Sequence, residues 1–272
     1  QAFNLTSSIR KIFNDKNYPI LIDQEGGKVN RLGNIISFNN LTSEFFGNKF
    51  IKNLMEFHIL YKLFIDKTSY LLKSIGVNIN TYPVLDLRVK GASSIIGNRS
   101  FSRSPKIVSK IGDYCIDYFH KNGIGTVMKH IPGHGLAKVD SHHLTPVVGK
   151  KLSYLIKRDF ASFKNKKTFF AMTAHIIFNQ IDNQNTVTQS KKLIKLIRKK
   201  IGFKNILISD DLSMKALKHS LKENVKKSFL AGCNLALHCN GNLKEMLIVA
   251  KNSPKINKFI IKKTSQLSHI IS

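Results

Sequence analysis

The segment from Gly125 to His143, GTVMKHIPGHGLAKVDSHH, decides how the rest of the sequence is interpreted. Its first four residues, GTVM, have the character of a buried strand, because they are small or apolar and no charge interrupts them. The stretch from Lys129 to His143 then forms a loop with four histidines, one aspartate, one proline and two glycines. Core packing does not require such residues, and polar loops just after strands usually serve a site. The segment therefore predicts a parallel strand that ends in a functional loop.

Apolar runs and amphipathic stretches alternate along all 272 residues. Such alternation, at spacings that permit right-handed β–α–β crossovers, predicts a parallel sheet covered by helices. The length suits one α/β domain of the (β/α)8 TIM-type barrel class over residues 1–272. Six of the eight strands can be counted; we expect the first strand before Gln1 and another to be irregular. The predicted strands are Tyr18–Ile22, Val77–Leu87, Gly125–Met128, Phe169–Ile177, Ile206–Ile208 and Cys233–Cys239, and the predicted helices are 1–16, 49–75, 105–122, 152–160, 190–201, 215–231, 242–251 and 255–270, the last of them covering the barrel.

Polar residues directly follow most of the predicted strands. The C-terminal ends of all strands in a parallel barrel meet on one face, so residues that follow the strands converge there. Randomly scattered charge would not favour strand ends so consistently. The pattern predicts one site where carboxylates, imidazoles and an ammonium group meet, drawn from Asp23, Glu25, Asp86, Lys129, His130, His134, His175, Asp210 and Asp211.

The chain is strongly basic, with 44 Lys and Arg against 16 Asp and Glu and a formal net charge of +28. Clustered cations can neutralise the phosphates of a nucleic acid. Here the lysines are scattered through almost every segment, and no aromatic stacking motif lies among them. We therefore interpret the charge as a solvated surface and predict no nucleic-acid partner. A long-range attraction for anionic ligands would still follow from this charge.

The three cysteines, Cys115, Cys233 and Cys239, lack the spacing of a disulfide framework or a metal site, which fits a reducing compartment. We expect Cys233 and Cys239 to be buried as small apolar residues. No apolar run is long enough to span a bilayer, and no signal-peptide pattern begins at Gln1. These observations predict a cytoplasmic monomer with no membrane partner, no metal and no other cofactor.

Five segments resemble the family 3 glycoside hydrolases, and among them the bacterial β-N-acetylglucosaminidases that recycle cell-wall fragments. Their order and separation match the family pattern, and they extend through nearly the whole chain. The family fold, a (β/α)8 barrel, agrees with the prediction from strand and helix alternation. Only Lys28 departs from the motifs, at a position where arginine is commoner. The segments are IDQEGGKVNR (22–31), PVLDL (83–87), GNRSF (97–101), KHIPGHG with DSH (129–142) and ISDDLSM (208–214).

This resemblance implies a retaining hydrolase that removes terminal β-linked N-acetylglucosamine. It also implies an amino-sugar substrate, usually a muropeptide fragment such as N-acetylglucosamine–anhydro-muramic acid. On the matching positions Asp210 would be the nucleophile, His142 the general acid/base, and Asp140 the carboxylate that orients the histidine. The positions that would hold the sugar hydroxyls are Asp23, Arg31, Arg99, Lys129 and His130.

The residue types also suit this chemistry on physical grounds. An ionised aspartate can attack the anomeric carbon and form an ester that water later cleaves. Histidine as a residue type titrates near pH 6.5, about the value needed to give up and regain a proton under neutral conditions. Asp140 precedes His142 by two positions and can fix its tautomer, like the carboxylate of a catalytic triad. We also expect the loop to move, so that the acid arrives after the sugar has bound.

Simpler interpretations remain open for several of these residues. The Asp140–His142 segment can be a solvated turn, and Asp210 or Asp211 can cap the following helix. Lys28 and Arg31 can pair with the carboxylates near them. Packing is the simpler role for His58 and His175, and His134 can hold the loop in shape.

Other functions also remain open. A β-glucosidase or β-xylosidase of the same family is one, although those enzymes mostly take their acid/base from a second domain, for which we expect no room in this chain. A basic nucleic-acid-binding protein is another. A metal hydrolase is a third, although no HExxH-type spacing is present.

Overall fold

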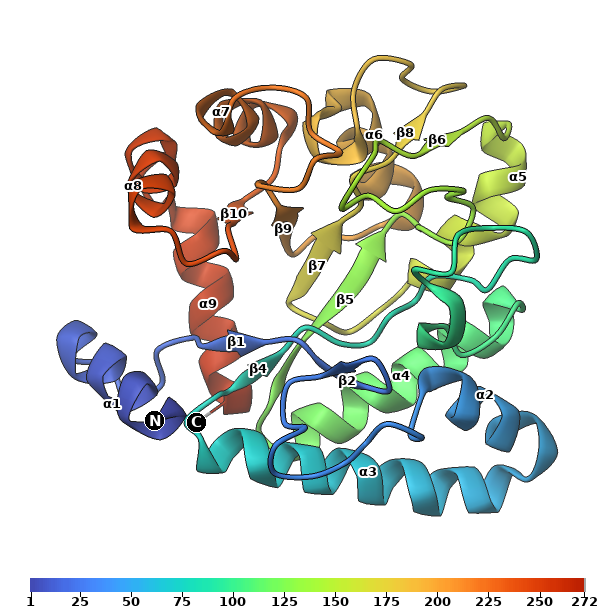
Figure 1. Ribbon diagram of the computed structural model, residues 1–272, viewed down its shortest axis with the longest axis vertical. Helices are drawn as coiled ribbons and strands as arrows, with labels where there is room; N and C mark the ends of the chain where they lie inside the picture. Colours follow the sequence, from blue (N-terminus) through green and yellow to red (C-terminus); the bar gives the residue numbers. More distant parts are fainter. Residues whose placement is uncertain (272) are drawn as a thin grey trace.

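The computed structural model describes residues 1–271 of the chain. Six parallel strands form one curled sheet, and their order in the sheet follows their order in the sequence (Figure 1). Sequential order is what short right-handed crossovers produce, and the predicted (β/α)8-type class is confirmed. Within residues 1–271 the two edge strands, β1 and β10, are not paired with each other. The strands are β1 (Leu21–Ile22), β4 (Ile79–Asn80), β5 (Gly125–Ile131), β7 (Phe170–Thr173), β9 (Ile206–Asp211) and β10 (Leu235–Leu237).

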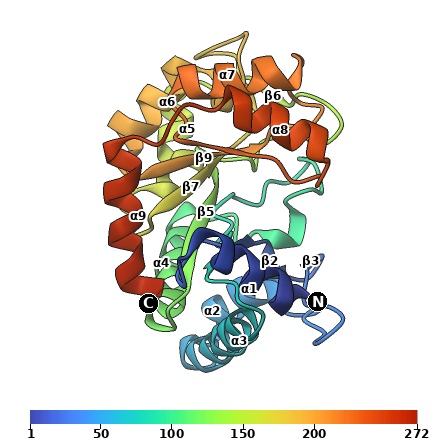
Figure 2. The same cartoon turned by 90° about the vertical axis from the view of Figure 1, so that its left-hand side faces the viewer.

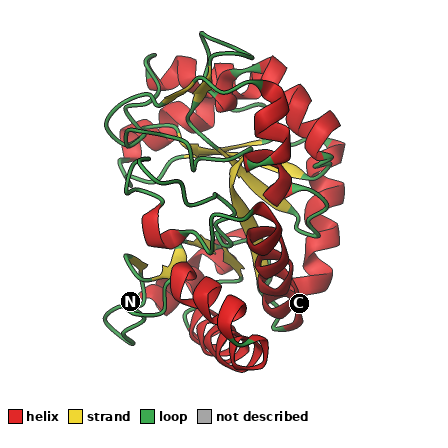
Figure 3. Ribbon diagram, turned by 90° about the vertical axis from the view of Figure 1, so that its right-hand side faces the viewer, coloured by secondary structure: helices red, strands yellow, loops and turns green. Residues whose placement is uncertain are grey.

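Helices cover the sheet, while the loops gather on one side of the molecule (Figure 3). None of the helices within residues 1–271 is long and apolar enough to cross a bilayer. The α-helices are α1 (Ala2–Phe13), α2 (Ser43–Lys52), α3 (Leu54–Ser74), α4 (Pro105–Lys121), α5 (Leu152–Lys157), α6 (Lys191–Leu196), α7 (Leu221–Ala231), α8 (Leu243–Asn252) and α9 (Lys258–Ile271). Short helical turns are η1 (Gly97–Arg99), η2 (Asp159–Phe163), η3 (Val187–Gln189) and the π-helical η4 (Ile197–Ile201).

Capping residues change the boundaries of two predicted helices, because each cap starts a helix inside the predicted range. The helix predicted over 49–75 is split at Asn53, whose extended backbone ends α2 and whose side chain accepts the Glu56 N–H at the start of α3. The helix predicted over 215–231 begins only at Leu221, where Ser220 and Glu223 form a reciprocal capping box. Asp210 and Asp211 therefore do not cap α7.

Four predicted strands are shorter than expected: Tyr18–Ile22 and Cys233–Cys239 are reduced to β1 and β10, and in the other two the chain leaves the sheet where it approaches the site. In the stretch predicted over Val77–Leu87, only β4 pairs continuously, and the chain returns to the sheet through one bridge between Val84 and Lys129. In the stretch predicted over Phe169–Ile177, β7 ends at Thr173. The next residues form β8 (Ile177–Phe178), which pairs in parallel with β6 (Val147–Val148) outside the main sheet. A separate ribbon, β2 (Gln24–Gly26) with β3 (Val29–Asn30), follows β1.

Alternating strand residues give the sheet two apolar faces. One face packs against the helices that follow the strands and includes Met128, Ala171 and Leu207. The other face packs against α9, which runs beside the strands in Figure 2. Met172 belongs to this second face and also lines the cavity that holds the predicted site residues, so α9 packs on the side of the sheet that holds the site. The contacting residues are Ile79, Val127, Phe170, Met172, Ile206 and Ile208 from the sheet with Ile260 and Leu267 from α9.

Candidate active site

A cavity of about 450 Å³ opens where the strands end, at the C-terminal edge of the sheet. Residues after β1, at the end of β5, at the end of β9 and after β10 all contribute to its wall. The convergence predicted from the polar strand ends is therefore present. The cavity brings together every residue singled out by the family resemblance: Asp23, Arg31, Arg99, Lys129, His130, Asp140, His142 and Asp210.

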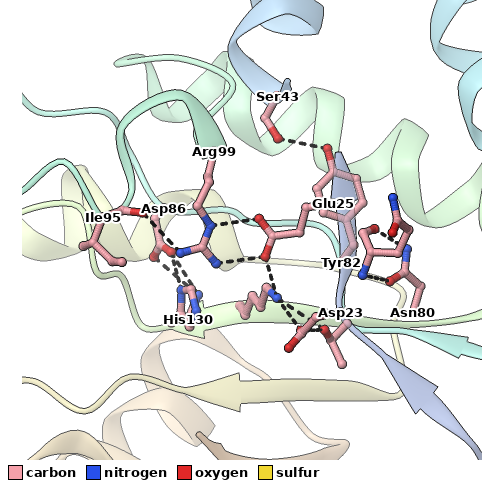
Figure 4. A network of polar contacts seen from close by, with 12 residues as sticks. Asp23, Glu25, Ser43, Asn80, Tyr82, Asp86, Ile95, Arg99 and His130 are labelled. Atoms are coloured by element: carbon pink, nitrogen blue, oxygen red, sulfur yellow. Dashed lines mark hydrogen bonds and ion pairs between the residues drawn. The ribbon is translucent and has the colours of Figure 1, made fainter. Parts of the chain in front are cut away.

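A buried ion cluster forms one wall of this cavity (Figure 4). Glu25 accepts two hydrogen bonds from the Arg99 guanidinium, both at 2.8 Å. The ammonium group of Lys129 lies 2.7 Å from Glu25 and 2.8 Å from Asp23. Burial alone would raise the pKa of Glu25, but the positive charges of Lys129 and Arg99 outweigh it and lower the pKa to about 2. The cluster is therefore fully charged at neutral pH.

This cluster corrects the simpler interpretation of Asp23 and Glu25. Both carboxylates pair across the cavity with residues distant in sequence, rather than with the neighbouring Lys28 and Arg31. Asp23 also accepts a hydrogen bond from Thr81. Arg31 lines the cavity with an exposed side chain and makes no ion pair within residues 1–271. The partner of Arg31 is therefore left to a ligand or to solvent.

A second buried carboxylate, Asp86, holds the two histidines of the KHIPGHG segment. Its oxygens lie 2.6 Å from Nδ1 of His130 and accept the backbone N–H of His134 at 2.6 Å. Burial would raise the pKa of Asp86, but His130 and His134 lower it. A hydrogen bond from Nδ1 leaves Nε2 of His130 as the ring atom available to the cavity.

Asp210 lies at the end of β9, is half-buried and lines the cavity. The backbone N–H of Asp211 donates to its carboxylate at 2.9 Å. Burial would raise the pKa of Asp210, but nearby His130 and His175 outweigh it, so the pKa lies below its ordinary value. His175 does not line the cavity; it is fully buried and bonds to Thr188 at 2.7 Å and to the Asp211 carbonyl at 3.0 Å. Asp210 is thus kept as a carboxylate, and His175 packs behind it.

Asp140 and His142 form a carboxylate–imidazole pair that lines the same cavity. One Asp140 oxygen accepts both the Nδ1–H and the backbone N–H of His142, each at 2.8 Å. The His142 side chain is 60% exposed, and it lines the same cavity as Asp210. Because Nδ1 is bound to Asp140, Nε2 is the atom left to exchange a proton. The segment is a turn, as the simpler interpretation held, but its side chains face the cavity.

The loop that bears this pair is attached to the fold on two sides. His134, which is buried, contacts the Ser141 hydroxyl through Nε2 at 3.2 Å. The Ser141 carbonyl accepts the backbone N–H of Ala216 at 3.2 Å. His134 therefore shapes the loop, as the simpler interpretation held, and its attachments flank the Asp140–His142 pair.

Sequence reasoning gave no assigned role to Glu25 and Asp86, which hold the cationic and imidazole groups in place. Their positions directly after strands were the available signal. His238 was missed altogether; its side chain is buried between Glu245 at 3.2 Å and Asp211 at 3.7 Å. The prediction for Cys239 was wrong. It is exposed and lines the cavity, because β10 ends at Leu237 and the Asn240–Gly241 turn follows.

Comparison with known proteins agrees with this geometry. The N-terminal domain of glycosyl hydrolase family 3 matches residues 4–266. The chain belongs to glycosyl hydrolase family 3. The motif resemblance is thereby confirmed. Each of the five segments either lines the cavity or holds residues that line it, as Asp86 of PVLDL holds His130 and His134.

Relatives within family 3 include a Beta-hexosaminidase of Neisseria meningitidis, 36% identical over 174 residues, which are 62% of this chain and 48% of that protein. The Beta-hexosaminidase of Nitrosomonas eutropha is 31% identical over 251 residues, covering 88% of this chain and 70% of that protein. The chain therefore spans about half the length of the Neisseria relative. Among solved structures, NagZ of Neisseria gonorrhoeae in complex with N-trifluoroacetyl-D-glucosamine superposes with a TM-score of 0.85 at 26% identity, covering 99% of this chain and 80% of NagZ.

Proposed function

We propose that the protein is a retaining β-N-acetylglucosaminidase. One observation supports this most directly: a single cavity contains an ionised aspartate, Asp210, and a separate Asp140–His142 pair that can exchange a proton. A retaining glycosidase needs both functions at one sugar ring, a nucleophile on one face and an acid/base for the leaving oxygen.

In the first step, a carboxylate oxygen of Asp210 attacks the anomeric carbon and forms a glycosyl ester. The bond between that carbon and the leaving oxygen breaks, and the leaving oxygen takes a proton from Nε2 of His142. Asp140, which holds Nδ1, stabilises the positive charge that the imidazole carries before it donates this proton. The leaving group departs as a neutral alcohol.

In the second step, water replaces the leaving group. Nε2 of His142 takes a proton from the water molecule, whose oxygen attacks the anomeric carbon and releases Asp210 as a carboxylate. Inversion at each step restores the original configuration. The lowered pKa of Asp210 suits it to both steps, because a carboxylate that remains ionised is a ready nucleophile and a ready leaving group.

The substrate we propose is a terminal β-linked N-acetylglucosamine on a muropeptide fragment. The Asp23–Lys129–Glu25–Arg99 cluster offers fixed charged acceptors and donors for sugar hydroxyls. The names of the relatives, Beta-hexosaminidase and a NagZ bound to an N-acylated glucosamine, point to an amino sugar. The notable alternative is a β-glucosidase or β-xylosidase of the same family.

An assay with an aryl β-N-acetylglucosaminide beside the matching β-glucoside tests the proposal. We expect turnover of the amino-sugar glycoside only, and a loss of at least ~10³-fold in Asp210→Ala, the scale for removal of a covalent nucleophile. Circular dichroism would check that the variant is folded. Equal cleavage of the glucoside would favour the alternative, and an Asp210→Ala variant within tenfold of wild type would exclude the mechanism.

A further inference from the structure

A second cavity, of about 310 Å³, is lined by residues of β8, of the segment that leads into η3, and of α7 with the residues just before it. The elements β8 and α7 lie near the top of Figure 1. We call it the amide–lysine pocket, defined by Gln184, Asn185, Gln189, Lys218, His219 and Lys227. The mechanism proposed above uses none of these residues.

The wall of the amide–lysine pocket offers hydrogen-bond donors and positive charge, and among residues 1–271 no acidic side chain lines it. Nζ of Lys227, which is half-buried, lies 2.5 Å from Nε2 of His219. One ammonium proton is directed to the ring, so two others remain for a ligand. Thr186 also lines the pocket, and its buried hydroxyl has no hydrogen-bond partner within residues 1–271. Buried hydroxyl groups normally form hydrogen bonds, so a buried hydroxyl without a hydrogen-bond partner indicates a place for a ligand.

The acidic groups nearest this pocket are already occupied. Asp182 accepts the backbone N–H groups of Gln184 and Asn185 and the Ser190 hydroxyl. Glu223 accepts the hydroxyl and the N–H of Ser220 in the capping box of α7. An adjoining cavity is lined by Asp182 together with two more lysines, Lys191 and Lys192, so lysines outnumber carboxylates there. The local charge is therefore positive, and a carboxylate, which only accepts hydrogen bonds when ionised, matches these donors.

The amide–lysine pocket is a close neighbour of the active-site cavity. Ser141 and Met214 line the active-site cavity, whereas Thr145 and Ala216 line the pocket. The two segments are joined by the Ala216 N–H to Ser141 carbonyl bond at 3.2 Å and by the Thr145 hydroxyl to Ala216 carbonyl bond at 2.7 Å. Met214 and Ala216 are two positions apart, so their Cα atoms are separated by at most about 7 Å. One layer of chain thus divides the two cavities.

We propose that the amide–lysine pocket binds a carboxylate carried by the leaving group of the substrate. The proposal rests on the glycosidase function proposed above, because the leaving group must extend past His142 toward Thr145. A carboxylate free in solution presents the same chemistry to these donors. The test therefore separates the two sources.

The test uses the whole chain and two matched lysine variants on α7. Lys227→Met removes the ammonium group from the pocket but keeps an unbranched apolar side chain. Lys226→Met removes the same charge from an exposed neighbour that lines neither cavity. Any effect of overall charge is equal in the two variants, so the difference between them reports on the pocket alone.

Two measurements are made on each protein. The first is calorimetric titration with glutarate, with neutral glutaramide as the control ligand. The second is kcat/KM for aryl β-N-acetylglucosaminides whose leaving phenol bears a terminal carboxylate or the matching carboxamide, on linkers of two lengths. We expect glutarate binding and a preference for the carboxylate, with Lys227→Met weakening both at least about tenfold and Lys226→Met leaving both unchanged, since a hydrogen bond to a charged group is worth that much.

Three other outcomes are decisive. Glutarate binding that depends on Lys227, without any preference among the glycosides, would establish a carboxylate site and overturn the assignment to the leaving group. Identical behaviour of Lys227→Met and Lys226→Met in both measurements would overturn the site itself. Failure of the wild type to cleave any glycoside would refute the glycosidase function, while the glutarate titration would still decide whether the pocket binds a carboxylate.

Discussion

At the scale of single residues, Asp159 is the clearest case of a group whose ionisation opposes the folded state. Its side chain is buried beside Gly133, and neither carboxylate oxygen has a hydrogen-bond partner within residues 1–271. Burial and the negative charge of Asp86 raise the pKa of Asp159 to about 6, although Arg158 partly offsets them. Because the folded protein binds the carboxyl proton of Asp159 more tightly than the unfolded chain does, protonated Asp159 stabilises the fold at low pH. That stability is lost as the pH rises through about 6.

The Asp159→Asn variant should therefore be more stable than wild type at pH 8 and similar to it at pH 4. A pKa raised from 3.8 to about 6 corresponds to at most roughly 3 kcal/mol at alkaline pH. Urea unfolding at both pH values measures this difference, with the exposed Asp15→Asn as the charge control. A stabilisation of the same size at pH 4 would show that ionisation of Asp159 is not its cause.

His142 permits a second prediction at this scale. A general acid matters most when the leaving oxygen is basic, so its removal should hardly affect a leaving group that departs without a proton. We expect His142→Ala to lower kcat/KM at least about 10²-fold for a phenyl β-N-acetylglucosaminide and much less for a dinitrophenyl one. Hydrolysis rates across a series of substituted phenols would reveal this as a steeper dependence on the phenol pKa. A uniform loss across the series would assign His142 to binding instead.

At the scale of elements, the loop from Lys129 to His143 is held closely at its beginning. A Cβ atom at Gly135 would lie 2.1 Å from the carbonyl oxygen of Leu87, so no larger residue fits unless the loop moves. Farther along, the loop is attached through Ser141 to His134 and Ala216. A displacement near Gly135 is therefore transmitted toward the Asp140–His142 pair.

Gly135→Ala should lower kcat about 10- to 100-fold, because a misplacement of about 1 Å is enough to disturb proton transfer. Gly149→Ala is the matched control, since a Cβ atom there has room and meets only Asn179 at 3.7 Å. Steady-state kinetics of both variants, with thermal melting to compare stability, make the measurement. Retention of full kcat in Gly135→Ala would show that the loop accommodates the displacement.

Elements could be predicted from the sequence where one signal dominates. All six strands were located because apolar runs end in polar loops. The segment from Gly125 to Asp140 shows this pattern most clearly. Helix boundaries failed at Asn53 and Ser220, because apolar residues continue at helical spacing on both sides of them, although Asn and Ser are preferred N-caps. The chain leaves the sheet after Asn80 and after Thr173. No local sequence pattern marks these points, because they depend on pairing with the neighbouring strands of the sheet.

The same limit applies to the site. That polar residues would meet was predictable from their places after strands, and the motif resemblance selected eight of them. The pairing was not predictable: Glu25 bonds to Arg99, 74 positions away, whereas Lys28 and Arg31 are nearer in sequence. Pairings of this kind depend on the register between strands, and a single sequence does not show it.

At the scale of the whole molecule, the net charge of +28 should guide anionic substrates toward the protein. The attraction acts over a Debye length, about 30 Å at 0.01 M salt and about 8 Å at 0.15 M. We expect kcat/KM for a carboxylate-bearing glycoside to fall about threefold or more as salt rises through this range, while a neutral glycoside is unaffected. An equal salt dependence for both substrates would point to an effect on the protein itself.

Because Glu25 pairs with two cations at once, the buried ion cluster tolerates substitution less well than the protein surface does. Glu25 binds Arg99 and Lys129 together, so replacing any one of the three leaves an uncompensated buried charge on the others, and two-step exchanges pass through a damaged intermediate. Lysines on the outer helices that pair with carboxylates, such as Lys62 and Lys121, do so at the surface, where an ion pair contributes little. Replacing an exposed residue of the outer helices by lysine or asparagine is therefore much less costly than replacing Glu25, Arg99 or Lys129.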